Sequence, residues 1–180
     1  MTLQNSIVTN KQKAIGWIKA IRPKFLISYI ILGFGGIVIG IINSSNKLNA
    51  PLLILSLCTI LLAGIGVHFR DEASDWLAGY DKIAGGVGVI REGILKVRSL
   101  QITGRVLTAI SLGLVILHTI IIWQLIYIVV PIVVVILASN FITEKISLGH
   151  EIGPAFAYSM ALLWVFLGQG WIFTFSTLFL

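Results

Sequence analysis

The sequence predicts an all-α integral membrane protein, a single membrane domain built as a bundle of about five transmembrane helices. Of its 180 residues, 57% are hydrophobic and only 11% are charged, whereas a soluble domain carries about 25% charged residues. The apolar residues gather into runs that are long enough to cross a bilayer, which takes about 20 residues in a helix. A soluble fold of this size could not bury so much apolar surface. The low fraction of charged residues and the long apolar runs therefore exclude a soluble fold.

The apolar runs give the expected elements in order. Isoleucines that recur every three residues before the first run predict a short helix with one apolar face, lying at the membrane interface. The run from 106 to 142 is too long for one crossing, and we divide it between His118 and Gln124, where Trp123 suits an interface. The expected elements are an interfacial helix at about 12–22 and spans at about 25–42, 51–67, 103–121, 124–141 and 154–176.

Charge sets the expected topology. Lysines and arginines concentrate before the first span and in the segment 68–100, whereas the first loop carries only Lys47. The positive-inside rule therefore places the N-terminus and the segment 68–100 in the cytoplasm of a multi-pass protein of the cell (inner) membrane. The same rule accounts for the net charge of +6, so the lipid bilayer is an expected partner and nucleic acid is not. The single cysteine, Cys58, excludes an internal disulfide framework.

An acidic segment follows the second span directly. It holds four of the chain's seven acidic residues, Asp71, Glu72, Asp75 and Asp81. If the span continues as a helix past the membrane edge, Asp71 and Asp75 are four positions apart and project from one face, about 5–6 Å apart. The two carboxylates repel each other, but both attract a divalent cation that binds between them. Carboxylates bind Mg²⁺ well when phosphate oxygens supply the remaining ligands. Asp81 could fold back toward the same cation.

Basic residues near this segment suit the other side of a phosphate group. Lys82 and Arg91 can supply charge-assisted hydrogen bonds to phosphate oxygens. The residues therefore indicate a Mg²⁺-diphosphate site at the cytoplasmic face. The same pattern also suits a solvated acidic loop, and the spacing by itself does not separate these two interpretations.

The segment Asp71-x-x-x-Asp75-x-x-x-Gly79-x-Asp81 resembles the first aspartate-rich motif of the UbiA-type membrane prenyltransferases. Three further stretches are similar to the family in the same order: Ala20-Ile-Arg-Pro23, Arg91-Glu-Gly93 and Leu148-Gly-His-Glu151. The last of these resembles the menaquinone branch, which joins a polyprenyl chain to 1,4-dihydroxy-2-naphthoate. The sequence departs from the family in two places: Arg70 stands where the family has asparagine, and three residues rather than two separate the first two aspartates.

The resemblance implies a function and a site. The family transfers a prenyl group from a prenyl diphosphate to an aromatic acceptor, with Mg²⁺ as cofactor, in quinone biosynthesis. Carried over to this sequence, Asp71 and Asp75 are the expected catalytic residues, and together with Asp81 they are the expected Mg²⁺ ligands. Arg22, Lys82 and Arg91 are the residues expected to bind the diphosphate.

The resemblance covers the N-terminal part of the family fold. Family members have nine spans and a second aspartate-rich motif between the sixth and seventh, whereas this sequence predicts about five spans and only the first motif. One interpretation is a truncated or incomplete enzyme that acts with a C-terminal half or partner helices. The alternative is a non-catalytic membrane remnant or assembly subunit of the same fold. A small transporter fits less well, because no charge lies in the middle of a span.

Overall fold

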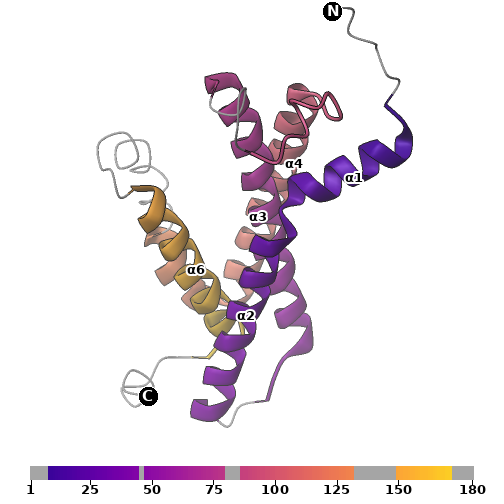
Figure 1. Ribbon diagram of the computed structural model, residues 1–180. Coiled ribbons are helices and arrows are strands. Elements are labelled where there is room, and N and C mark those ends of the chain that lie inside the picture. The colour runs from indigo at the N-terminus through magenta and orange to yellow at the C-terminus, as the bar shows by residue number, and fades with distance from the viewer. Residues whose placement is uncertain (1–7, 45–46, 80–85, 132–148, 172–180) are drawn as a thin grey trace, which may run out of the picture. The chain divides into compact units, whose positions relative to one another are not determined.

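The computed structural model describes residues 8–44, 47–79, 86–131 and 149–171, and their regular structure is entirely helical (Figure 1). Its contacts divide the chain into two compact units. The first unit combines Met1–Leu26 with Leu62–Ile110, and the second combines Ile27–Leu61 with Ser111–Leu180.

The helices are longer than the predicted spans at several ends. Among the described residues, three helices are long and apolar enough to cross a membrane, as a membrane protein requires. The elements are α1 (Asn10–Ile21), α2 (Pro23–Ser44), α3 (Ala50–Ala78), α4 (Val97–Ile121), the 3₁₀ turn η1 (Trp123–Leu125) and α6 (Gly149–Gly168). α3 continues well past residue 67, where the apolar run ends, so that the acidic stretch up to Ala78 is helical.

The predicted division of the long apolar run falls where the structure breaks its helix. α4 ends at Ile121, Ile122 leaves the helical conformation with φ −122° and ψ 88°, and η1 follows before the chain is helical again from 126 to 131. The rest of the predicted fourth span, 132–141, lies outside the described residues. α4 begins at Val97 rather than at 103, because Val97 and Leu100 pack into the core of the first unit.

α6 differs from the predicted fifth span at both ends. It begins at Gly149, so His150 and Glu151 belong to its first turn rather than to a loop. It ends at Gly168 rather than near 176, since the chain turns at Gly170, which has a φ of 75°. A positive φ is readily adopted by glycine and is incompatible with a continuing right-handed helix.

α1 is fixed at both ends by local hydrogen bonds. Thr9 and Gln12 form a capping box, in which Gln12 N–H donates to Thr9 Oγ1 (3.3 Å) and Thr9 N–H donates to Gln12 Oε1 (2.8 Å). At the other end, Arg22 adopts a left-handed conformation with φ 54°, and its N–H donates to Lys19 O (3.0 Å). Pro23 then opens α2, a position where proline costs no hydrogen bond.

We expect Thr9→Ala to weaken the start of α1 by about 1 kcal/mol, because the first-turn N–H groups lose their side-chain acceptor. Hydrogen exchange of the full chain in lipid nanodiscs measures the effect as faster exchange in the first turn of α1. Lys11→Ala, a change of an exposed residue in the same turn, is the control and should leave the exchange rates close to wild type. Equal rates in Thr9→Ala and wild type would contradict the capping assignment.

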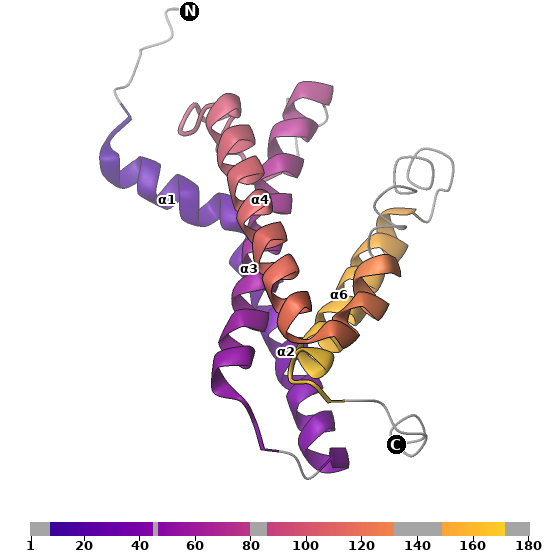
Figure 2. The same cartoon turned by 180° about the vertical axis from the view of Figure 1, so that it is seen from behind.

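The first unit has a core formed by the end of α3, the start of α4, α1 and the segment after residue 86. Trp17 of α1 packs against Phe69 of α3, with ring centroids 5.2 Å apart. α3 and α4 run side by side in both views (Figures 1 and 2) and touch through Gly66 and Gly104. The buried members of this core are Ala20, Phe69, Ala73, Val89, Leu95 and Leu100.

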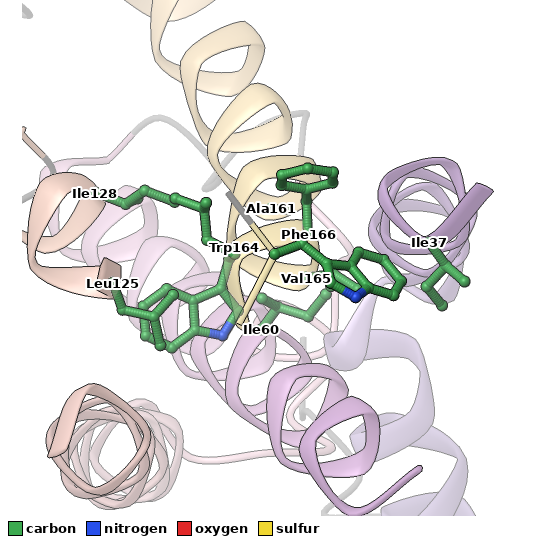
Figure 3. Close-up of a cluster of buried hydrophobic side chains, with 10 residues drawn as sticks. Ile37, Ile60, Leu125, Ile128, Ala161, Trp164, Val165 and Phe166 are labelled. Atoms are coloured by element: carbon green, nitrogen blue, oxygen red, sulfur yellow. The ribbon is translucent and has the colours of Figure 1, made fainter. Parts of the chain in front are cut away.

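The second unit has a separate apolar core centred on α6 (Figure 3). Trp164, Val165 and Phe166 are at most 3% exposed and pack against α2, α3 and the chain after Ile122. Its buried members are Ile37, Ile60, Leu125, Ile128, Ala161, Trp164, Val165, Phe166, Leu167 and Trp171. Ile31 and Ile120, in contrast, are 63% and 75% exposed, as expected for side chains that face lipid hydrocarbon rather than water.

Candidate functional site

The end of α3 presents its three acidic residues in three different environments. Asp71 is exposed, Asp75 is half-buried and Glu72 is only 2% exposed. Because α3 is helical to Ala78, Asp71 and Asp75 lie one turn apart on the same face. The structure thus meets the condition on which the predicted pairing of these two carboxylates depended.

Glu72 is the centre of a buried polar contact that joins three parts of the first unit. Its Oε2 accepts a hydrogen bond from Arg22 Nη2 at 3.0 Å, forming a salt bridge. Both of its carboxylate oxygens also accept from Val87 N–H, at 3.2 and 3.1 Å. Glu72 therefore holds the junction of α1 and α2 and the segment that follows residue 85 against α3.

Arg22 lines a shallow depression with a basic rim. The depression has a volume of about 500 Å³, and Arg22 is 24% exposed there. A guanidinium has five N–H donors, so those not used by Glu72 can reach an anion. The lining residues are Lys19, Arg22, Pro23, Lys24, Phe25, Gly86 and Val87.

Arg91 lies on the compact turn that leads to α4. This turn is closed by hydrogen bonds from Glu92 N–H to Gly88 O (2.9 Å) and from Ile94 N–H to Val89 O (3.0 Å). A Cβ atom added to Gly88 would lie 3.2 Å from Arg91 Nη2. Since Gly88 directly follows Val87, which binds Glu72, the structure brings Arg22 and Arg91 to the same segment of the first unit.

The described residues include only part of the predicted Mg²⁺-diphosphate site. Asp81 and Lys82 fall in 80–85, outside the described residues. In the parts of the chain that are described, no three His, Cys, Asp or Glu side chains gather into a metal site. The described part of the predicted Mg²⁺ site is therefore the pair Asp71 and Asp75, two carboxylates of the kind that Mg²⁺ prefers as ligands.

The role of Glu72 is not predicted by the sequence pattern, in which it is one acid of an acidic segment. The structure buries it between Phe69 and Ala73 on one stripe of α3. A signal was present, because positions 69, 72 and 73 share a helical face and two of them are apolar. An acid on an apolar stripe predicts a buried partner, which here is Arg22.

No protein-family model, curated protein or solved structure matches this chain. The family assignment therefore stays a prediction that depends on the motifs quoted above.

Proposed function

We propose that the end of α3 and the adjoining depression form one half of a Mg²⁺-diphosphate site, and that the chain takes part in prenyl transfer to an aromatic acceptor. The observation that supports this most is the position of Arg22. Glu72 holds it in a basic depression of the same unit that carries the Asp71–Asp75 pair. The first unit thus carries both acidic and basic side chains, and binding of a metal-bound diphosphate needs both kinds.

The acidic and the basic residues of the proposed site bind different groups. Asp71 and Asp75, with Asp81, hold Mg²⁺, which when bound neutralises negative charge on the leaving diphosphate. The diphosphate oxygens are bound by Arg22, Arg91 and Lys82. The hydrogen bond from Arg22 to Glu72 orients the guanidinium before the diphosphate binds. As the allylic C–O bond breaks, its electron pair leaves with the diphosphate. The aromatic acceptor then attacks the prenyl carbon and loses a proton or its carboxylate.

The same proposal includes the chemical class of the aromatic acceptor and the membrane face on which the site lies. The closest resemblance is to the menaquinone branch, so the acceptor class is a dihydroxynaphthoate-like aromatic ring. The N-terminus and the segment 68–100 face the cytoplasm of the cell (inner) membrane, where soluble diphosphates are available. A second aspartate-rich motif, supplied by a C-terminal half or by partner helices, completes the site.

The binding half of this proposal is tested with the full chain in lipid nanodiscs and radiolabelled farnesyl diphosphate. We expect Mg²⁺-dependent retention of the label by wild type, and a fall of at least about tenfold in the variant carrying Asp71→Asn and Asp75→Asn, because the metal loses both described ligands. Arg98→Gln is the control, since Arg98 is an exposed charged residue of the same unit that does not line the depression, and should bind like wild type. Retention that is equal with EDTA, or in both variants, would contradict the site.

The catalytic half is tested by adding an aromatic acceptor to membranes that contain the chain with a co-expressed segment bearing a second aspartate-rich motif. A prenylated product that requires both parts supports the proposal. Mg²⁺-dependent binding without any product would instead favour a non-catalytic assembly subunit of the same fold.

A further inference from the structure

Three buried polar side chains lie near the ends of three helices in the second unit. Ser56 of α3 and His118 of α4 are 0% exposed, and Trp164 of α6 is 3% exposed. They surround one point on α6: a Cβ atom added to Gly168 would lie 2.5 Å from Ser56 Oγ and 2.7 Å from His118 Cε1. Trp164 lies one turn before Gly168, and its ring meets that of His118 edge-on at a centroid distance of 5.3 Å.

The hydrogen bond of His118 fixes its tautomer. His118 Nε2 lies 2.9 Å from Gly168 O, and a carbonyl oxygen can only accept, so Nε2 carries the hydrogen and donates. In the neutral ring Nδ1 is then an acceptor. Within the part of the chain that the structure describes, neither this Nδ1 atom nor Ser56 Oγ nor Trp164 Nε1 has a hydrogen-bond partner.

Two hydroxyl groups of α4 donate to backbone carbonyls. Ser111 Oγ donates to Thr59 O at 3.0 Å, and Thr119 Oγ1 donates to Val115 O at 2.8 Å. Ser56 makes no such bond to the described residues. Leaving a buried polar group without a hydrogen bond costs free energy. One buried acceptor and two buried donors on neighbouring side chains therefore suit a ligand that can both donate and accept.

We propose that Ser56, His118 and Trp164 bind an internal water molecule between α3, α4 and α6. Water donates to His118 Nδ1 and accepts from both the Ser56 hydroxyl and the Trp164 indole, so one molecule satisfies the acceptor and the two donors that have no partner. The site lies close to the ends of its helices: Ser56 is about 9 Å from the start of α3 and His118 about 5 Å from the end of α4. Gln169, whose Oε1 accepts from Asn49 N–H at 2.8 Å, adds a polar group beside this end.

Magnetic resonance of the full chain in nanodiscs, labelled with ¹⁵N-tryptophan, tests for the water directly. The Trp164 indole N–H, assigned by its loss in Trp164→Phe, should show a cross-peak to water. A buried indole with no water cross-peak, or with one to a protein group from the rest of the chain, would overturn the proposal.

The sign of a stability change provides a second readout. Ser56→Ala should lower the melting temperature by about 2–4 °C, because it removes a hydrogen bond to the bound water. If the hydroxyl were dry and unpaired, its removal would leave the melting temperature unchanged or raise it, and the proposal would fail. Ser74→Ala, the same change at an exposed position of α3, is the control and should have no effect. Neither readout depends on prenyl diphosphate, so this proposal and the proposed function fail separately.

Discussion

Replacement of Glu72 by alanine is expected to destabilise the protein by about 3 kcal/mol, near the lower end of the range for breaking a buried ion pair. Glu72 is only 2% exposed and accepts hydrogen bonds from both Arg22 and Val87 N–H. Its loss leaves one cation and one backbone donor without their acceptor. The lower end of the range applies because Arg22 is 24% exposed and can turn toward water or a lipid headgroup.

The reciprocal change provides a directional test of the same contact. Arg22→Ala should cost more than Glu72→Ala, because it leaves the more deeply buried charge unpaired. Denaturation in mixed micelles, followed by circular dichroism, gives the two free energies of unfolding.

A matched control exists in the same unit. Lys19 and Glu92 form a salt bridge at 3.9 Å with side chains 47% and 48% exposed. Glu92→Ala should therefore change the free energy of unfolding by less than about 1 kcal/mol. If Glu72→Ala and Glu92→Ala had equal effects, the buried contact at Glu72 would not be the junction that the structure describes.

The parts of the fold that follow from local sequence could be predicted. The membrane character, the break between His118 and Gln124, and the helical spacing of Asp71 and Asp75 all depend on hydropathy or on periodicity within a few turns. The predicted start of this span at 103 is later than the observed start of α4 at Val97, because the basic residues around Val97 favour a loop. Packing of Val97 and Leu100 into the core overrides that local signal.

The contacts that position the candidate site could not be predicted from local pattern, because they join residues far apart in the chain. Glu72 binds Arg22, which is 50 positions away, and His118 bonds to Gly168 at the same separation. An acidic residue beside a membrane span has several available partners, and spacing does not choose among them. The sequence thus identifies the charged residues but not their contacts. The packing of α1 against α3 determines that Glu72 binds and orients Arg22, while Asp71 remains exposed.

Substitution of Gly104 by alanine is expected to cost about 1–3 kcal/mol by overpacking the contact between α3 and α4. A Cβ atom at Gly104 would lie 2.9 Å from Gly66 O and 3.2 Å from Phe69 Cβ. A backbone carbonyl inside a helix cannot retract as a flexible side chain does, so the two helices must separate. Small residues that permit such close approach are a common basis of helix association in membranes.

Gly113 on the same helix separates this packing effect from helix propensity. It is exposed, and a Cβ atom there would meet nothing within 4 Å. Gly113→Ala should therefore stabilise the protein by up to about 1 kcal/mol, since alanine favours the helix over glycine. Opposite signs for Gly104→Ala and Gly113→Ala in the same denaturation assay support the contact, and equal signs contradict it.

Combining Gly66→Ala with Gly104→Ala tests whether the two glycines belong to one contact. A Cβ atom at Gly66 would lie 3.0 Å from Gly104 O and 2.7 Å from Thr108 Oγ1. Once one substitution has moved α3 and α4 apart, the second meets less resistance. The cost of the double variant should therefore be smaller than the sum of the single costs, by at least about 0.5 kcal/mol. Strict additivity would show that the two positions act independently, and the close approach of α3 and α4 would then need another explanation.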